Sequence, residues 1–114
     1  MSNRRPIILA HAFDKRGRLL AVATNSYTKT HPLQAYFAKK VGHPAKQFLH
    51  AELACILRCK DQQIHTLRIF RYGANGELAC AKPCPICQEA IVAYGIPNIW
   101  YSDNNTMAKL YTDK

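Results

Sequence analysis

The chain has 114 residues, 48% of them hydrophobic, and carries 16 Lys and Arg against 7 Asp and Glu, which gives a formal net charge of +9. This length suits a single domain over residues 1–114, and the only N-terminal apolar run, residues 7–10, is too short for a signal peptide or a membrane span. Five cysteines, an odd number, argue against a disulfide framework and favour a reducing, cytoplasmic compartment.

Apolar periodicity predicts strands and helices that alternate along the chain. In order they are strands at 6–13 and 19–24, helices at 33–41 and about 49–60, a strand at 64–72, a helix at 85–94 and a strand at 96–102. Predicted turns or breaks lie at 14–18, 42–44, 73–76 and 103–105, and a basic loop through Lys46 precedes the second helix. The tail, 106–112, is predicted as a closing strand rather than a short helix. This order predicts a three-layer α/β domain.

Two short motifs supply ligands that zinc prefers. Residues 83–87 read Pro-Cys-Pro-Ile-Cys, and residues 50–52 read His-Ala-Glu. The thiolates of Cys84 and Cys87 and the imidazole of His50 can fill three positions of a tetrahedral zinc site and leave the fourth open. An open position distinguishes a catalytic zinc site from a structural one.

Helix geometry determines where these side chains can meet. Residues two apart on a helix point about 200° away from each other, so His50 and Glu52 can face one metal only from the helix N-terminus. Pro85 suits the first position of a helix, with Cys84 just before it. We therefore expect two helix N-termini to converge on one zinc ion per chain, with Glu52 as the group that carries protons.

The order His-x-Glu followed by Pro-Cys-x-x-Cys is the signature of zinc-dependent deaminases. The chain resembles the cytidine deaminase-like superfamily in these two motifs and, over residues 6–103, in the order of its elements. The resemblance implies a central mixed β-sheet flanked by helices, with zinc held by His50, Cys84 and Cys87. It also implies hydrolytic conversion of cytosine to uracil with release of ammonia, with Glu52 as the catalytic residue.

The resemblance extends to substrate contacts. Asn25 ends the second strand, where superfamily members often place an asparagine that bonds the substrate sugar, although an ordinary turn asparagine is the alternative. His31 lies in the same loop and could contact sugar or phosphate, or could instead belong to the start of the next helix. The backbone at Ala51 would hold the base carbonyl, and the backbone near Ala81 and Lys82 would hold the base amino group.

Two features divide the subfamilies, and here they disagree. Members with a hairpin after the fourth strand lie nearer to free-nucleoside deaminases and some bacterial toxin deaminases. Members with an intervening helix lie nearer to the deoxycytidylate, tRNA-adenosine and vertebrate polynucleotide cytosine deaminases. Too few residues follow Ser102 for a long helix and a further strand, yet His-Ala-Glu, rather than Cys-Ala-Glu, is more usual in the second group.

Other candidate residues have simpler interpretations. Cys80 as a fourth ligand would close the site and leave Glu52 without a role, so we favour the open site. Cys55 and Cys59 are one helical turn apart and are expected to pack as small apolar residues. Three aromatic residues are candidate platforms for stacking a base, with a core position as the alternative: Tyr27, Trp100 and Tyr101.

The positive charge is concentrated before the histidine motif. Residues 1–49 carry nine Lys and Arg against one Asp, or +8, while residues 50–114 carry seven against six, or +1. Such an excess either aids solubility or forms a rim that binds phosphate. The nine cations are Arg4, Arg5, Lys15, Arg16, Arg18, Lys29, Lys39, Lys40 and Lys46.

From this charge we expect the substrate to be cytosine in a single-stranded nucleic acid. The alternative is free cytidine, deoxycytidine or their monophosphates. An adenine or guanine deaminase and a non-catalytic, zinc-stabilised nucleic-acid-binding domain are less favoured, the latter because a structural site needs no acid such as Glu52. We expect no membrane partner, and the sequence predicts no particular oligomeric state.

Overall fold

The computed structural model describes residues 6–42, 48–73 and 75–110. Within these ranges, in chain order, the elements are β1 (Ile7–Phe13), β2 (Leu19–Thr24), α1 (Pro32–Lys40), α2 (Ala51–Cys59), β3 (Thr66–Tyr72), β4 (Leu78–Ala79), α3 (Pro85–Ala93), β5 (Asn98–Asp103) and β6 (Thr106–Leu110). The predicted strands and helices are all present, and the tail is a strand as predicted. Several residues of the predictions lie outside the described ranges: Arg4, Arg5, His43, Pro44, Lys46, Tyr111 and Thr112.

The strands form one mixed sheet in the order β2-β1-β3-β5-β6, with β4 paired to β3. β3 and β5 run parallel, and the remaining pairs are antiparallel. Parallel neighbours need a long crossover, which α3 supplies between β3 and β5. The mixed sheet and its helices confirm the predicted α/β fold class.

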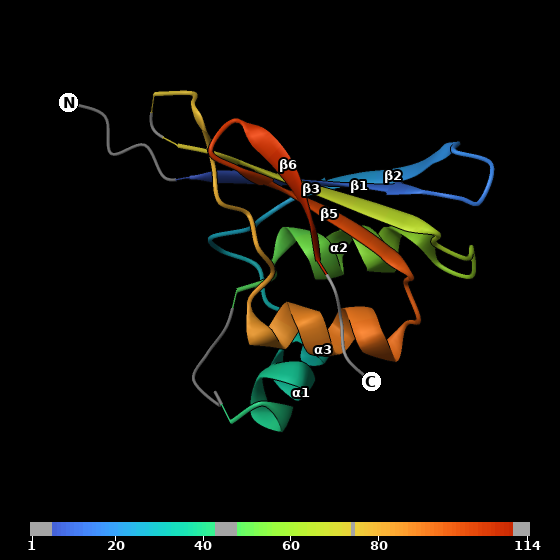
Figure 1. Ribbon diagram of the computed structural model, residues 1–114. Helices are drawn as coiled ribbons and strands as arrows, with labels where there is room; N and C mark the ends of the chain where they lie inside the picture. The colour runs from blue at the N-terminus through green and yellow to red at the C-terminus, as the bar shows by residue number, and fades with distance from the viewer. Residues whose placement is uncertain (1–5, 43–47, 74, 111–114) are drawn as a thin grey trace.

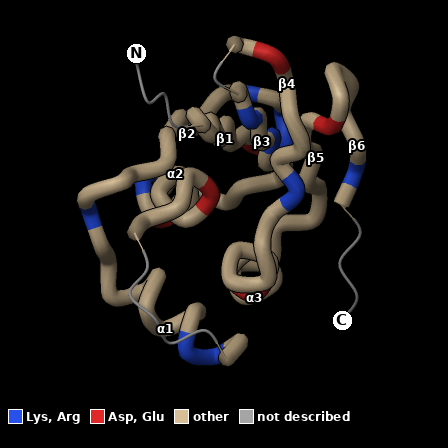
Figure 2. Tube along the Cα trace, turned by 90° about the vertical axis from the view of Figure 1, so that its left-hand side faces the viewer, with Lys and Arg blue, Asp and Glu red and all other residues tan. Residues whose placement is uncertain are grey.

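The three layers are the sheet, the helix pair α2 and α3, and then α1. Figure 1 shows all three helices beneath one face of the sheet, with α1 farthest from it, and Figure 2 shows that α2 and α3 lie next to each other. α2 packs against β1 and β2, whereas α1 packs against α3. Among the described residues, therefore, the helices cover only one face of the sheet. None of these helices is long and apolar enough to span a bilayer.

Strand alternation explains the core. On β1 and β3, the residues that face the helices are fully buried, and small alanines on β1 let α2 approach closely. Cys55 and Cys59 of α2 are buried there, as predicted, and burial raises the pKa of Cys55 to about 12. The fully buried residues of β1 and β3 in this core are Ala10, Ala12, Leu67 and Ile69.

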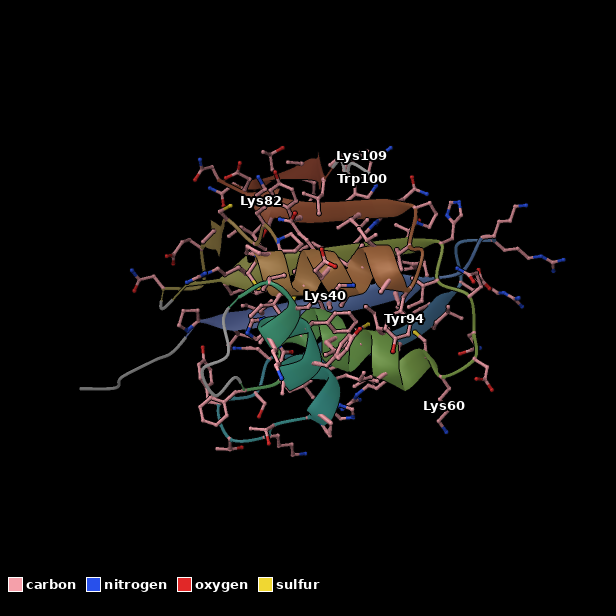
Figure 3. The ribbon with its side chains drawn as sticks, turned by 90° about the horizontal axis from the view of Figure 1, so that it is seen from below. Lys40, Lys60, Lys82, Tyr94, Trp100 and Lys109 are labelled. Atoms are coloured by element: carbon pink, nitrogen blue, oxygen red, sulfur yellow. The ribbon has the colours of Figure 1, made fainter. Side chains whose placement is uncertain are left out.

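The other face of the sheet carries half-buried aromatic rings in contact with cations. The ring of His11 lies 5.4 Å from that of Phe70, and the Arg68 guanidinium lies 5.2 Å from the centre of the Phe13 ring. At the β5–β6 edge, the Lys109 ammonium lies 5.9 Å from the Trp100 ring, and Figure 3 shows this pair from below. These contacts shield apolar rings from water on a face that no described helix covers.

A tight turn joins β5 to β6. Asn104 and Asn105 both have positive φ, 49° and 67°, which is the conformation that a two-residue type I′ hairpin requires. Asparagine tolerates this region better than other residues with a side chain. The turn confirms the prediction at 103–105 and places β6 antiparallel to β5.

Candidate metal centre and active site

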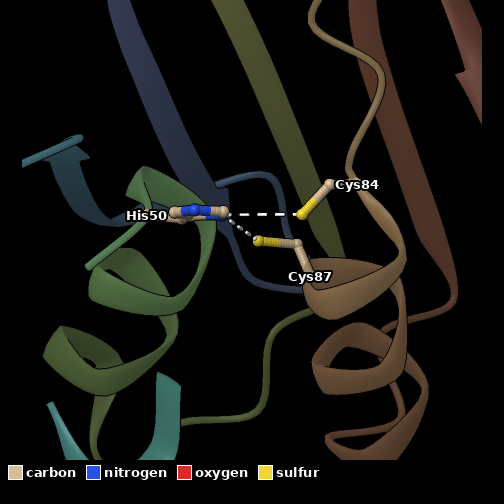
Figure 4. Close-up of side chains that lie close together, drawn as sticks. All are labelled: His50, Cys84 and Cys87. Carbon is tan, nitrogen blue, oxygen red and sulfur yellow. Dashed lines mark hydrogen bonds between the residues drawn. The ribbon is translucent and has the colours of Figure 1, made fainter. Parts of the chain in front are cut away.

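The two motifs stand at the starts of two helices. His50 is the N-cap residue of α2, and Cys84 is the N-cap residue of α3, with Pro85 in the first turn. Neither N-cap side chain makes a capping hydrogen bond to its own helix, so each is available to contact the other. Figure 4 shows His50, Cys84 and Cys87 brought together between the two helix ends, as the sequence predicts.

The distances between these side chains fit a tetrahedral zinc ion. The Nδ1 atom of His50 lies 3.2 Å from Sγ of Cys87 and 3.6 Å from Sγ of Cys84. Zn–S bonds of about 2.3 Å and Zn–N bonds of about 2.0–2.1 Å, at tetrahedral angles, place sulfur and nitrogen about 3.6 Å apart. All three ligand atoms lie within 4.8 Å of one another, so this group could hold a metal ion.

The pKa values of the two thiols are shifted in opposite directions. A hydrogen bond from Cys87 lowers the pKa of the Cys84 thiol to about 4, and the same contact, with burial, raises the pKa of Cys87. The hydrogen bond with Cys84 also raises the pKa of His50. A divalent cation held by these side chains would displace the thiol protons and stabilise both thiolates, which is the usual coupling between metal binding and deprotonation.

Glu52 is a buried acid beside the ligand group. It lies in the first turn of α2, and its side chain is buried, with 5% of the residue exposed. Burial raises the pKa of its carboxyl group. A carboxyl group whose pKa is moved toward neutrality can both accept and donate a proton during one reaction.

A cavity of about 400 Å³ opens at the ligand group. This volume lies within the range of small-molecule sites. Its wall includes eight residues that the sequence analysis names: Asn25, Tyr27, His50, Glu52, Cys80, Ala81, Lys82 and Cys84.

The predicted substrate contacts separate into those at the cavity and those away from it. Asn25 lies on the wall, and its Oδ1 accepts the backbone N–H of Ile8 at 2.9 Å, which joins β2 to β1. The N–H of Ala81 donates to the Ser102 carbonyl at 2.8 Å and so fixes the segment before α3. Ala51 is fully buried as the first residue of α2.

His31 has another partner. It is the N-cap residue of α1, and its Nδ1 accepts the backbone N–H of Leu33 at 3.0 Å. It is not part of the cavity wall. The helix-start interpretation of His31 therefore describes its position, and its proposed contact with sugar or phosphate stays a prediction.

Cys80 lies on the cavity wall but outside the ligand group. It is exposed, and the group that could hold a metal contains only His50, Cys84 and Cys87 among the described residues. The three-ligand arrangement leaves room for a fourth ligand from solvent or substrate.

Sequence reasoning missed Gln34, Arg71 and Phe48. Gln34 of α1 is fully buried, and its Oε1 accepts the N–H of His50 at 3.1 Å, so it holds the backbone from which the ligand extends. Arg71 and Phe48 line the cavity. Arg71 could have been found, because it continues the alternation of Leu67 and Ile69 on β3 and therefore faces the helices.

The comparisons with known proteins agree with this geometry. No family model and no curated protein sequence matches the chain. The chain is similar in structure to the cytidine deaminase from Mycobacterium leprae, with a TM-score of 0.55 and 15% identity, over 92% of this chain and 75% of that one. A mutant of the cytidine deaminase from Mycobacterium tuberculosis gives a TM-score of 0.53 and 14% identity, over 94% and 75%. The chain therefore has the cytidine deaminase fold, as its motifs and element order predict.

Proposed function

We propose that this protein is a zinc-dependent hydrolytic deaminase that converts cytosine to uracil and releases ammonia, and that it takes cytosine from a single-stranded nucleic acid. One observation carries the proposal. His50, Cys84 and Cys87 converge from two helix N-termini, and buried Glu52 stands beside them on the wall of one cavity.

The reaction adds water to the base and removes ammonia. Zinc bound by the three ligands would supply a Lewis acid that makes water nucleophilic at neutral pH. Glu52 takes a proton from the attacking water and passes it to the ring nitrogen, which makes the neighbouring ring carbon electrophilic. Glu52 then moves a second proton to the leaving amine, so that cytosine and water become uracil and ammonia.

The rest of the wall supports recognition of a nucleotide unit. Arg71 and Lys82 line the cavity, and Glu52 is the only acidic residue among the described lining residues. This charge favours a substrate that carries phosphate. Tyr27 and Phe48, each 38% exposed, offer aromatic surface on the same wall for a base to stack on. We assign Asn25 to the sugar and the backbone at Ala51 and Ala81 to the base edges.

A free cytidine nucleoside or nucleotide is the second candidate substrate. The β5–β6 hairpin supports it, because the resemblance associates this hairpin with free-nucleoside deaminases, as well as with some bacterial toxin deaminases. The two structural neighbours are also cytidine deaminases. A non-catalytic, zinc-stabilised domain is disfavoured, because it would bury the Glu52 carboxyl group without using it.

Ammonia release by the zinc-loaded protein tests the proposal. Cytidine, its monophosphate and a single-stranded oligonucleotide with one cytosine are offered separately, and uracil formation is confirmed by mass. We expect turnover of the oligonucleotide. Turnover of the free compounds alone would select the second candidate. If adenine or guanine compounds alone react, the base assignment is wrong, and if no substrate reacts, the proposed function is wrong.

A further inference from the structure

We propose that the nucleotides next to the target cytosine bind in a basic groove along α2, which the β2–α1 loop separates from the candidate active site. The inference rests on the proposed function, and it assigns a second binding site to the nucleic-acid strand that carries the target cytosine. A free nucleotide would fill only the cavity at Glu52, whereas a strand would occupy both places.

The groove is an open depression of about 630 Å³. It is bounded by the end of β2, the β2–α1 loop and one side of α2. The groove and the active-site cavity share three residues, Asn25, Ser26 and Tyr27. The groove and the cavity are thus separated by a wall only a few residues wide. A nucleic-acid strand that leaves the cavity can pass directly into the groove.

Hydrogen bonds fix this wall beside the metal ligands. The N–H of Ser26 donates to the Leu49 carbonyl at 3.0 Å, and the N–H of Leu49 donates to the Lys29 carbonyl at 2.8 Å. Leu49 precedes His50 directly. At the wall, the hydroxyl of Tyr27 donates to the Pro6 carbonyl at 2.7 Å, which holds an aromatic ring between the two spaces.

The groove has the charge that a phosphate backbone needs. Lys29, Arg58 and Lys60 line it and are exposed, and no acidic residue is among its described lining residues. Asp61, which follows Lys60 in the chain, does not line the groove but lines a smaller cavity together with Lys60. None of the three cations forms a salt bridge with a described residue. In Figure 2, the β2–α1 loop passes α2 on the side away from α3, and part of this loop is blue, the colour of Lys and Arg.

A second groove, at the opposite end of the sheet, is also basic but does not adjoin the active-site cavity. It measures about 660 Å³ and is lined by Lys15, Arg16 and Arg18, but Asp14 shares it and pairs with Arg18 at 2.9 Å. Its described lining includes no residue of the active-site cavity. Its cations therefore serve as a control for general electrostatic attraction.

The length of the groove along α2 fits a short stretch of single-stranded nucleic acid. Arg58 lies seven residues after Ala51, or about 10 Å along the axis of α2, and Lys60 extends from the end of the helix (Figure 3). At about 3.4 Å per stacked nucleotide, this distance corresponds to about three nucleotides. Two or three phosphates of the flanking segment could then contact the three cations.

The test compares two triple variants that lose the same charge. One carries Lys29→Gln, Arg58→Gln and Lys60→Gln in the groove along α2, and the control carries Lys15→Gln, Arg16→Gln and Arg18→Gln in the groove at the opposite end of the sheet. For each, kcat/KM is measured with a 12-nucleotide single strand that holds one cytosine and with cytidine monophosphate. Binding of a fluorescent copy of the strand is measured against salt concentration.

We expect the groove variant to lose about tenfold or more in kcat/KM for the 12-nucleotide strand and to keep its rate with the monophosphate. Its slope of log affinity against log salt should become shallower by about 2, since each lost phosphate contact contributes roughly 0.7. The control variant should lose much less, and shortening the strand below about four nucleotides should imitate the groove variant.

Failure of this inference can be distinguished from failure of the proposed function. Equal losses in the two variants, or equal binding of duplex DNA, would overturn the groove while deaminase activity stands. If the wild type turns over neither substrate, the proposed function fails. In that case, a single strand that binds to the wild type and the control variant but not to the groove variant would still support a groove that binds nucleic acid.

Discussion

Helices α1 and α2 are both nine residues long and both follow an N-cap histidine, yet the two histidines have different partners. His31 turns back onto α1 and accepts the N–H of Leu33. His50 leaves its own helix without a side-chain cap and points its Nδ1 toward Cys87 and Cys84. One N-cap side chain therefore caps its own helix, whereas the other belongs to a group of side chains that could hold a metal ion.

The residue at the second position of each helix also distinguishes α2 from the other two helices. It is Leu33 in α1, Glu52 in α2 and Ile86 in α3, so only α2 places an acid there. The first-turn N–H groups of α2 and α3 favour negative charge beside them, because four N–H groups at each helix start lack partners within the helix. Thiolates and a carboxyl group are gathered at these two starts, and α1 has neither.

The largest expected effect is at Glu52. Glu52→Gln keeps the size of the side chain but removes its ability to carry protons, so turnover should fall about 100-fold or more. Zinc content and melting temperature should match those of the wild type, because Glu52 is not a ligand. Measuring all three separates chemistry from folding. Residual turnover within about tenfold of wild type would show that another group moves the protons.

Next in size is the loss of the metal. Cys84→Ser removes the thiolate that begins α3, and zinc per chain, measured after dialysis, should fall well below one. Cys80→Ser removes a thiol from the same cavity wall and should leave zinc at one per chain. Equal zinc content in the two variants would exclude Cys84 as a ligand, and a loss in Cys80→Ser would make the site a closed one.

A smaller effect is expected in thiol reactivity after zinc is removed with a chelator. Because the pKa of Cys84 is lowered to about 4, this thiol should be alkylated at pH 6, where Cys55, with a pKa of about 12, should not react. Added zinc should protect Cys84. The stabilisation from this lowered pKa is present above the unfolded value, about 8.5, and is lost as the pH falls through about 4. Mass mapping that finds no Cys84 adduct at pH 6 would contradict the assignment.

The smallest effect belongs to α1. His31→Ala removes a helix cap and should lower the free energy of unfolding by about 1 kcal/mol, as measured by urea denaturation. Zinc content should not change, and His31→Asn, which caps in the same way, should restore most of the stability. A rise in KM with normal stability would instead assign His31 to the substrate.

The sequence predicts the element order and the ligand group for local reasons. The i, i+2 spacing of His50 and Glu52 requires a helix start, and Pro85 places Cys84 at another. β4 could not be predicted, because Leu78 and Ala79 are too short a segment to show periodicity and are held only by pairing with β3. The burial of Gln34 could not be predicted either, because it too depends on a distant part of the chain. A glutamine on a short helix signals exposure, and its burial depends on the distant N–H of His50.

The chain separation of the ligands affects folding. His50 and Cys84 are 34 residues apart, and all of β3 and β4 lies between them. A zinc bridge across that interval would form only in the folded chain, so the free energy of zinc binding would add to the stability of the fold. Such a bridge would also join two helices, α2 and α3, that belong to different segments of the chain. The same three side chains would thus stabilise the folded chain as well as form the catalytic metal site.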